Sequence, residues 1–150
     1  GDVYKRQVWE DEFVSIQERY KRGVFALDTA LFLHDLTDRT PHKFHMAFPY
    51  GYNTSSPKAA GILCSCKKEP YYSLGIALVD TPAGNTVRAY NAEKTLCEIL
   101  KPISHTDIQI ITDAFKRYAG RKDKNIPLLS EYAHQLRVEK RLRPYLEVLL

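Results

Sequence analysis

The sequence has little of what a metal site, a disulfide framework or a membrane anchor requires. It contains three cysteines and one methionine, and no apolar run approaches the ~18 residues that cross a bilayer. No segment combines the charged, apolar and small-residue regions of a signal peptide. What is present is a chain of 150 residues, 44% hydrophobic and 27% charged, which is typical of one globular domain. We therefore expect a cytoplasmic domain without a membrane partner.

The cysteines and histidines do not form a metal motif. Cys64 and Cys66 flank Ser65 and Cys97 stands alone, so a zinc site would lack its second ligand pair. On a strand, Cys64 and Cys66 would share one face as reduced, small apolar side chains. The five histidines fall in different segments: His34, His42, His45, His105 and His134. The sequence thus predicts no metal and no cofactor.

Catalytic signatures are also missing. A metal-dependent nuclease would place an acid, and then an acid-x-Lys pair, on neighbouring strands to hold Mg²⁺. Glu93 is instead followed directly by Lys94, and 121–124 has the composition of a turn. There is no glycine-rich phosphate loop and no serine or cysteine elbow motif. We predict that the chain is not an enzyme and has no catalytic residues. A metal-dependent nuclease that uses Asp80 or Glu93 ranks third among the hypotheses for the function.

The charge of the chain is concentrated near its C-terminus. The net charge is +4, yet residues 1–100 hold equal numbers of basic and acidic side chains, so the excess lies in 101–150. Five basic residues fall within nine positions: Lys116, Arg117, Arg121, Lys122 and Lys124. This cluster predicts contact with nucleic acid or an acidic partner. The alternative is that Lys116 and Arg117 complement a helix C-terminus while the others solvate a turn.

Two helices are expected before residue 40. Trp9, Phe13, Ile16 and Tyr20 share one face of an amphipathic helix, which Gly23 would end as a C-cap. The apolar segment 25–41 predicts a buried helix that ends near residue 36, with Asp28 in its first turn and a break ahead of the proline at 41.

The middle of the chain predicts strands and the end predicts helices. Phe44, Met46 and Phe48 alternate with His45 and Ala47, as in a strand. Further β-rich segments are 62–67, 72–79 and 86–90, the last two joined as a hairpin. Helices are expected over 92–100, 107–118, from 127, and toward the C-terminus. We therefore predict an α+β fold, with a small, mainly antiparallel sheet flanked by N-terminal and C-terminal helices.

The first residues do not resemble the rest of the chain. The string GDVYKRQ has no periodicity that continues into the following helix, and 2–7 resemble the translated end of a sequencing adapter. We interpret 1–7 as a scar of this kind and 8–150 as a single domain.

Long strings of the sequence resemble one protein family. ALFLHDLTDRTP, FHMAFP and GYNTSS, then NAEKTLCEIL, and finally the segment from DIQIITDAF to the C-terminus are similar to the antitoxin domain of AbiEi-type proteins. These proteins belong to type IV abortive-infection toxin-antitoxin systems. The resemblance covers 9–150 and implies that this domain counters a nucleotidyltransferase-type toxin without forming a stable complex. The residues that match family strings are His34, Asp38, Arg39, Asn53, Glu93 and Thr95.

The resemblance also implies that an upstream domain is missing, and the sequence departs from the family pattern at two positions. Family members carry a winged helix-turn-helix domain upstream, through which the parent protein would bind DNA as an autorepressor, so this chain resembles an N-terminally truncated member. Lys94 stands where the family usually has arginine, whose planar fork an ammonium lacks. Asp35 stands where the family often has glycine at a helix exit. Nothing in the resemblance identifies the surface that contacts a partner, or the oligomeric state.

Overall fold

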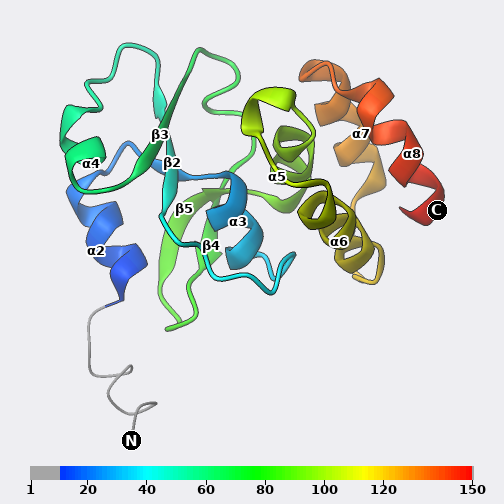
Figure 1. The fold of residues 1–150 in the computed structure, drawn as a ribbon, viewed down its shortest axis with the longest axis horizontal. Coiled ribbons are helices and arrows are strands. Elements are labelled where there is room, and N and C mark those ends of the chain that lie inside the picture. The colour runs from blue at the N-terminus through cyan, green and yellow to red at the C-terminus, as the bar shows by residue number, and fades with distance from the viewer. Residues whose placement is uncertain (1–10, 150) are drawn as a thin grey trace, which may run out of the picture.

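A computed structural model describes residues 11–149 of the chain. The described helices and strands are α2 (Glu12–Arg19), β1 (Val24–Phe25), α3 (Leu27–Leu33), β2 (His45–Pro49), α4 (Ser55–Ala59), β3 (Leu63–Lys67), β4 (Ile76–Asp80), β5 (Thr86–Tyr90), α5 (Ala92–Ile99), the 3-10 helix η1 (Pro102–Ser104), α6 (Ile108–Ala119), α7 (Ile126–Gln135) and α8 (Glu139–Leu149). The sheet lies between α2 and α4 at one end and α5–α8 at the other (Figure 1). The α+β class predicted from the sequence is therefore confirmed. The expected scar at 1–7 and the first turn from Trp9 lie outside the described residues.

The sheet predicted to be mainly antiparallel is mixed and not purely antiparallel. Its five strands have the order β3-β2-β1-β5-β4. The pairs β1–β2 and β4–β5 are antiparallel, whereas β1–β5 and β2–β3 are parallel. The connection from β2 to β3 contains α4 and acts as a crossover, which brings β3 back parallel to β2.

One face of the sheet is covered by α2. Phe13 from α2 contacts Phe25 of β1 edge-to-face, with ring centroids 5.4 Å apart, and Met46 and Phe48 of β2 join the same buried cluster. Ala47, on the opposite face, belongs to a second cluster with Tyr72 and Tyr90. The alternation predicted for this strand is therefore confirmed. Because both faces are covered, every residue from Met46 to Phe48 is buried.

A third cluster joins the helices. It contains Leu31 of α3, Leu36 just after it, half of the residues of α5, and apolar residues from α6, α7 and α8. Every residue of α5 is buried, so this helix lies inside the helical layer rather than on its surface. Helices α5, α6 and α7 begin with side-chain caps, since the side chains of Asn91, Asp107 and Asn125 accept hydrogen bonds from backbone N–H groups of the first turn.

The N-terminal helices are shorter than expected. Phe25 lies in β1, not in a helix, because its backbone pairs with Met46 on one side and Ala89 on the other. Helix α2 ends at Arg19, so Gly23 is not its C-cap. Gly23 instead packs against β2: a Cβ on Gly23 would lie 2.5 Å from the Cε of Met46, so that side chain would have to shift.

The exit of α3 explains why its helix ends early. Asp35 adopts a left-handed conformation, with φ of +57°. The Leu36 N–H then donates to the carbonyl of Leu31, which closes the helix end as in a Schellman motif. Asp35 thus takes a left-handed conformation that glycine adopts more readily. No helix among residues 11–149 has the length and apolar composition needed to cross a membrane.

Two glycines allow a direct test of close packing. Gly75 and Gly84 both have positive φ, +82° and +90°, but only at Gly75 would a Cβ meet another side chain, the Cβ of Lys94 at 2.7 Å. Gly84→Ala should cost about 1 kcal/mol of unfolding free energy from backbone strain. Gly75→Ala should cost about 2 kcal/mol more because it also forces α5 away from the preceding turn. Urea denaturation of both variants measures the difference, and equal losses would contradict the contact.

Candidate functional site

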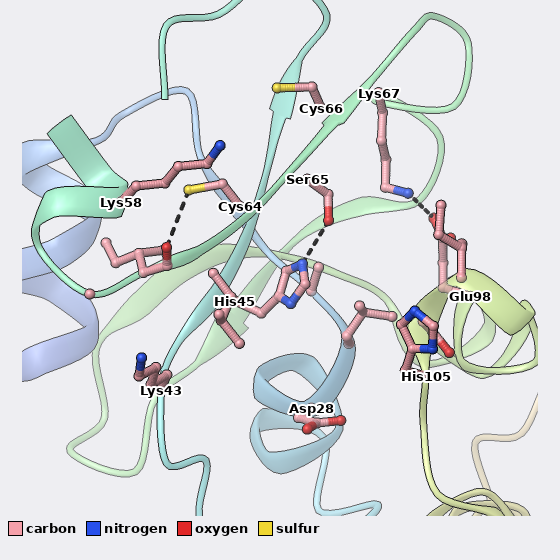
Figure 2. Close-up of a pocket in the computed structure, with 17 residues that line it drawn as sticks. Asp28, Lys43, His45, Lys58, Cys64, Ser65, Cys66, Lys67, Glu98 and His105 are labelled. Carbon is pink, nitrogen blue, oxygen red and sulfur yellow. Dashed lines mark hydrogen bonds and ion pairs between the residues drawn. The ribbon is translucent and has the colours of Figure 1, made fainter. Parts of the chain in front are cut away.

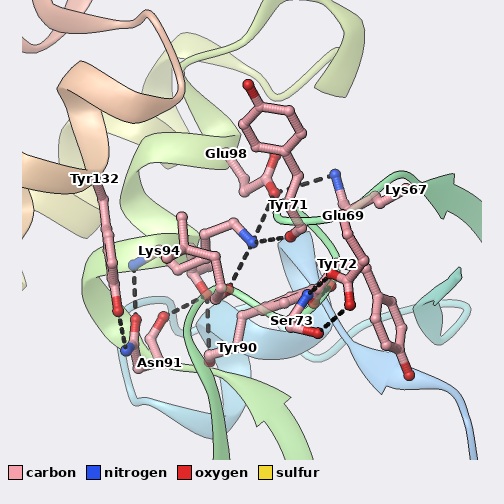
Figure 3. Close-up of polar contacts among 12 residues, drawn as sticks. Lys67, Glu69, Tyr71, Tyr72, Ser73, Tyr90, Asn91, Lys94, Glu98 and Tyr132 are labelled. Carbon is pink, nitrogen blue, oxygen red and sulfur yellow. Dashed lines mark hydrogen bonds and ion pairs between the residues drawn. The ribbon is translucent and has the colours of Figure 1, made fainter.

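The charged residues of α5 are buried, and Lys94 is the most enclosed of them. Its side chain has no solvent exposure, and its Nζ donates to the carbonyl oxygens of Tyr71 at 2.7 Å and Leu74 at 2.8 Å. Glu98 Oε1 lies 3.4 Å away, one turn further along the helix. The ammonium also lies 3.8 Å from the centroid of the Tyr90 ring. Figure 3 shows these groups converging on the Lys94 nitrogen from the turn before β4, from α5 and from β5.

Burial lowers the pKa of Lys94 to about 8, although the Glu98 carboxylate acts in the opposite direction. Glu98 is 4% exposed, and its Oε1 also lies 3.1 Å from Lys67 Nζ. Both ammonium groups are within ion-pair distance, but neither makes a well-aligned hydrogen bond to Oε1. The negative charge of the Glu98 carboxylate is therefore compensated by two nearby ammonium groups, without a well-aligned hydrogen bond to Oε1. Lys94 does not make the bidentate contact that an arginine could make.

The other family-string residues of α5 also bond within the domain. Glu93 Oε2 accepts from the hydroxyl of Tyr118 at 2.6 Å, and that hydroxyl accepts from the Asn125 N–H at 2.6 Å. Burial, followed by the bond to Glu93, raises the pKa of Tyr118. Thr95 Oγ1 donates to the carbonyl of Asn91 at 2.8 Å. These contacts tie α5 to α6 and to the start of α7.

His34 links α3 to the sheet and to the basic cluster. Its Nε2 lies 2.7 Å from the carbonyl oxygen of Tyr90, and Arg121 donates to the His34 carbonyl at 2.8 Å. Burial lowers the pKa of His34, while the bond to Tyr90 acts in the opposite direction. The family-string residues His34, Glu93 and Thr95 thus share one structural network around α5.

The predicted basic cluster is largely occupied by contacts within the domain. Arg117 pairs with Asp113 at 2.8 Å across one turn of α6, and Arg121 bonds both oxygens of Asp123 at 2.8–2.9 Å. Lys124 donates to the carbonyl of Ala119 at the end of α6. Lys116 and Lys122 are exposed and form no ion pair with any residue of 11–149. The structure therefore leaves three of the five, Lys116, Lys122 and Lys124, without an ion-pair partner among residues 11–149, and the side chains of Lys116 and Lys122 also form no hydrogen bond there.

The remaining family-string residues are exposed. Asp38 and Arg39 lie in the loop between α3 and β2. Asn53 precedes α4, where its side chain accepts from the Ser55 N–H at 3.0 Å. They do not join the network around α5.

A cavity of about 670 Å³ runs along β3, and we call it the β3 groove. Its residues are Ala26, Leu27, Asp28, Lys43, His45, Lys58, Gly61, Ile62, Leu63, Cys64, Ser65, Cys66, Lys67, Glu98, Ile103, Ser104 and His105. Figure 2 shows His45 and Ser65 meeting at its centre, with Lys58 on one side and Glu98 and His105 on the other. The groove thus lies between the edge of the sheet, the start of α3 and η1.

The polar pair at the centre of the groove comes from neighbouring parallel strands. His45 Nε2 lies 2.6 Å from Ser65 Oγ. Burial, and secondly the positive charge of Lys67, lower the pKa of His45 to about 4. At neutral pH the imidazole is therefore uncharged and can donate or accept a hydrogen bond. The sequence identified His45 but gave no reason to place it beside Ser65, because the register of two parallel strands is not visible in residue spacing.

The described residues contain no group of three or more histidine, cysteine or acidic side chains close enough to hold a metal ion. Cys64 and Cys66 are unpaired thiols, and burial raises the pKa of Cys64. The acids named for the nuclease alternative lie in different surroundings: Glu93 is buried against Tyr118, whereas Asp80 is exposed at the end of β4.

A second cavity, of about 600 Å³, lies between the end of α3, the β4–β5 hairpin and the end of α6. It brings together His34, Asp80, Arg117 and Arg121. Both arginines are already paired with acids, so this cavity offers less free charge than the β3 groove.

The buried charge of Lys94 gives a stability prediction with an internal control. Lys67 pairs with the same Glu98 carboxylate, but its side chain is 20% exposed against 0% for Lys94. Lys94→Met should lower the unfolding free energy by about 3 kcal/mol, because it removes one of the two cations beside a buried carboxylate and leaves the carbonyls of Tyr71 and Leu74 without their donor. Lys67→Met should cost about 1 kcal/mol or less. Chemical denaturation measures the loss of unfolding free energy in both variants. Similar losses would show that the burial of Lys94 does not increase its contribution to stability.

The neutral imidazole of His45 predicts an acid-sensitive fold. Its pKa is about 4 in the folded chain and 6.5 ordinarily, so below pH 6.5 the unfolded chain binds the proton more readily. Stability should therefore be fully present above pH 6.5 and fall as the pH drops toward 4. His45→Asn should weaken this fall while leaving stability at pH 7.5 little changed. Thermal unfolding between pH 4.5 and 7.5 measures the slope, and an unchanged slope would exclude His45 as its source.

Comparison with known protein families and with curated proteins finds no match to the chain. The resemblance to AbiEi-type proteins therefore rests on the quoted strings alone.

Proposed function

We propose that residues 8–150 form the antitoxin domain of an AbiEi-type protein. In this role the domain counteracts a nucleotidyltransferase-type toxin, encoded beside it, that arrests growth during phage infection. The domain has no enzymatic chemistry of its own in this proposal and acts in the cytoplasm. It uses no cofactor.

One observation carries the proposal: three of the five strings that resemble the family fall on elements that pack together. These strings cover α3 with its exit, α5 and α6–α8, and residues from all of these segments join one buried cluster. Of the other two, FHMAFP covers β2, whose Met46 and Phe48 belong to the cluster under α2, and GYNTSS leads into α4. A resemblance confined to scattered surface segments would not have this property. This coincidence supports a resemblance between whole folding units rather than between short motifs.

The proposal divides the parent protein into two parts. An upstream winged helix-turn-helix domain would bind the promoter and repress the operon, whereas the present domain would provide protection from the toxin. Type IV antitoxins act without a stable toxin complex, so protection does not require a permanent interface. Most of the basic cluster is paired within the domain, which supports a role other than phosphate binding for this part of the chain.

Co-expression with the neighbouring toxin tests the proposal. Residues 8–150 should restore growth to cells that express the toxin, and a toxin with an inactivated catalytic site provides the baseline. Leu96→Asp places a charge at a site with no exposure and should abolish protection by unfolding the domain. Unchanged toxicity in the presence of a folded, abundant domain would refute the antitoxin function.

A matched surface variant separates this proposal from nucleic-acid binding. Lys116→Glu with Lys122→Glu reverses the two cations of the cluster whose side chains form neither an ion pair nor a hydrogen bond within residues 11–149, without touching Arg121, which holds the His34 carbonyl. Protection should persist in this variant. Loss of protection together with loss of salt-dependent RNA or DNA binding would instead favour the nucleic-acid alternative.

A further inference from the structure

The outer edge of β3 is unpaired in the described chain. β3 is the last strand of the sheet, and its only neighbour among residues 11–149 is β2. The Leu63 N–H donates to Phe44, and the Lys67 carbonyl accepts from Tyr50, so these residues direct their backbone groups toward β2. Because successive residues of a strand alternate, Cys64 and Cys66 direct their N–H and C=O groups outward. Such an edge can pair with a further strand.

The β3 groove follows this edge for the whole length of the strand. Each residue from Ile62 to Lys67 lines it, and η1 forms part of the opposite wall. Two large apolar side chains are exposed at the groove, Leu63 at 48% and Ile103 at 82%. The groove therefore combines an open backbone edge with two exposed apolar side chains to which a ligand's side chains could bind.

The charges around the groove are mainly positive. Lys43 and Lys58 line it and form no ion pair with any described residue. Glu98 is already balanced by Lys67 and Lys94. Asp28 is the one exposed acid among the lining residues. A ligand in the groove would thus meet more free positive than negative charge.

We propose that the β3 groove binds an extended, acidic segment of a partner protein. The segment adds a strand to β3 through the backbone groups of Cys64 and Cys66, as in other cases of strand addition. One aliphatic side chain of the segment packs against Leu63 and Ile103, and its acids lie near Lys43 and Lys58. This inference does not depend on the antitoxin proposal.

The opposite edge of the sheet provides the comparison. β4 also ends the sheet and exposes a leucine, Leu78, at 75%. However, β4 contains no lysine or arginine and ends in Asp80. An acidic strand should therefore prefer β3 to β4, although both edges have free backbone groups.

Titration of the isotopically labelled chain with a designed peptide tests the proposal. The probe is an acetylated, amidated heptapeptide of alternating valine and acidic residues, followed by NMR. The amide signals of Cys64 and Cys66 should shift most, and a peptide with lysine in place of the acids should bind at least about tenfold more weakly. Ile103→Asp should reduce affinity about tenfold, since it removes an apolar contact and adds repulsion. Leu78→Asp, the matched substitution at the other edge, should leave affinity unchanged.

Four results would overturn the inference. The first is no binding at millimolar peptide, and the second is equal binding of the acidic and basic peptides. The third is an unchanged affinity when the peptide amides that face β3 are methylated, because strand addition requires those donors. The fourth is an equal effect of free glutarate at the same concentration, which would indicate an adventitious anion site only.

Discussion

The burial of the Lys94 ammonium is the constraint on which the arrangement of α5 depends. A charged nitrogen with no exposure must find acceptors within the protein. Lys94 finds them in the carbonyls of Tyr71 and Leu74, and in Glu98 one turn along its own helix. The turn before β4 is thereby held against the helix, where the absence of a side chain at Gly75 permits the approach. The position of α5 and the entry into β4 are therefore determined together.

Elements with local signals were predicted well, and those set by tertiary pairing were not. Helix α5 begins at a side-chain cap, at Asn91, that is visible in the sequence. β1 gave no signal of its own, because two residues at the start of an apolar run have no measurable period. Its place at the centre of the sheet depends on pairing with β2 and β5, which lie far along the chain. Non-local pairing also determines that β3 runs parallel to β2, and no turn residue in the sequence indicates this direction.

The candidate site was less predictable than the fold, for two physical reasons. The β3 groove joins residues around 27, 45, 65 and 103, which only the finished fold brings together. Counting charges along the sequence also did not reveal that both arginines of the basic cluster have acidic partners within the domain. Asp113 lies one turn from Arg117, and Asp123 lies two residues after Arg121, so each arginine had its acid within reach along the chain.

The family resemblance therefore describes the framework of the domain more than its contacts. His34, Glu93 and Thr95 bond to backbone or side chains inside the structure, so their presence is explained by folding. Asn53 positions a helix start in the same sense. Asp38 and Arg39 are exposed and have no comparable role among the described contacts. Residues that fold a domain can identify its relatives while leaving its partner surface free to differ, and the β3 groove lies outside all six of these positions. His45 and Glu98 are the lining residues of the groove that fall within the strings FHMAFP and NAEKTLCEIL, so most of the groove lies outside the strings that carry the resemblance.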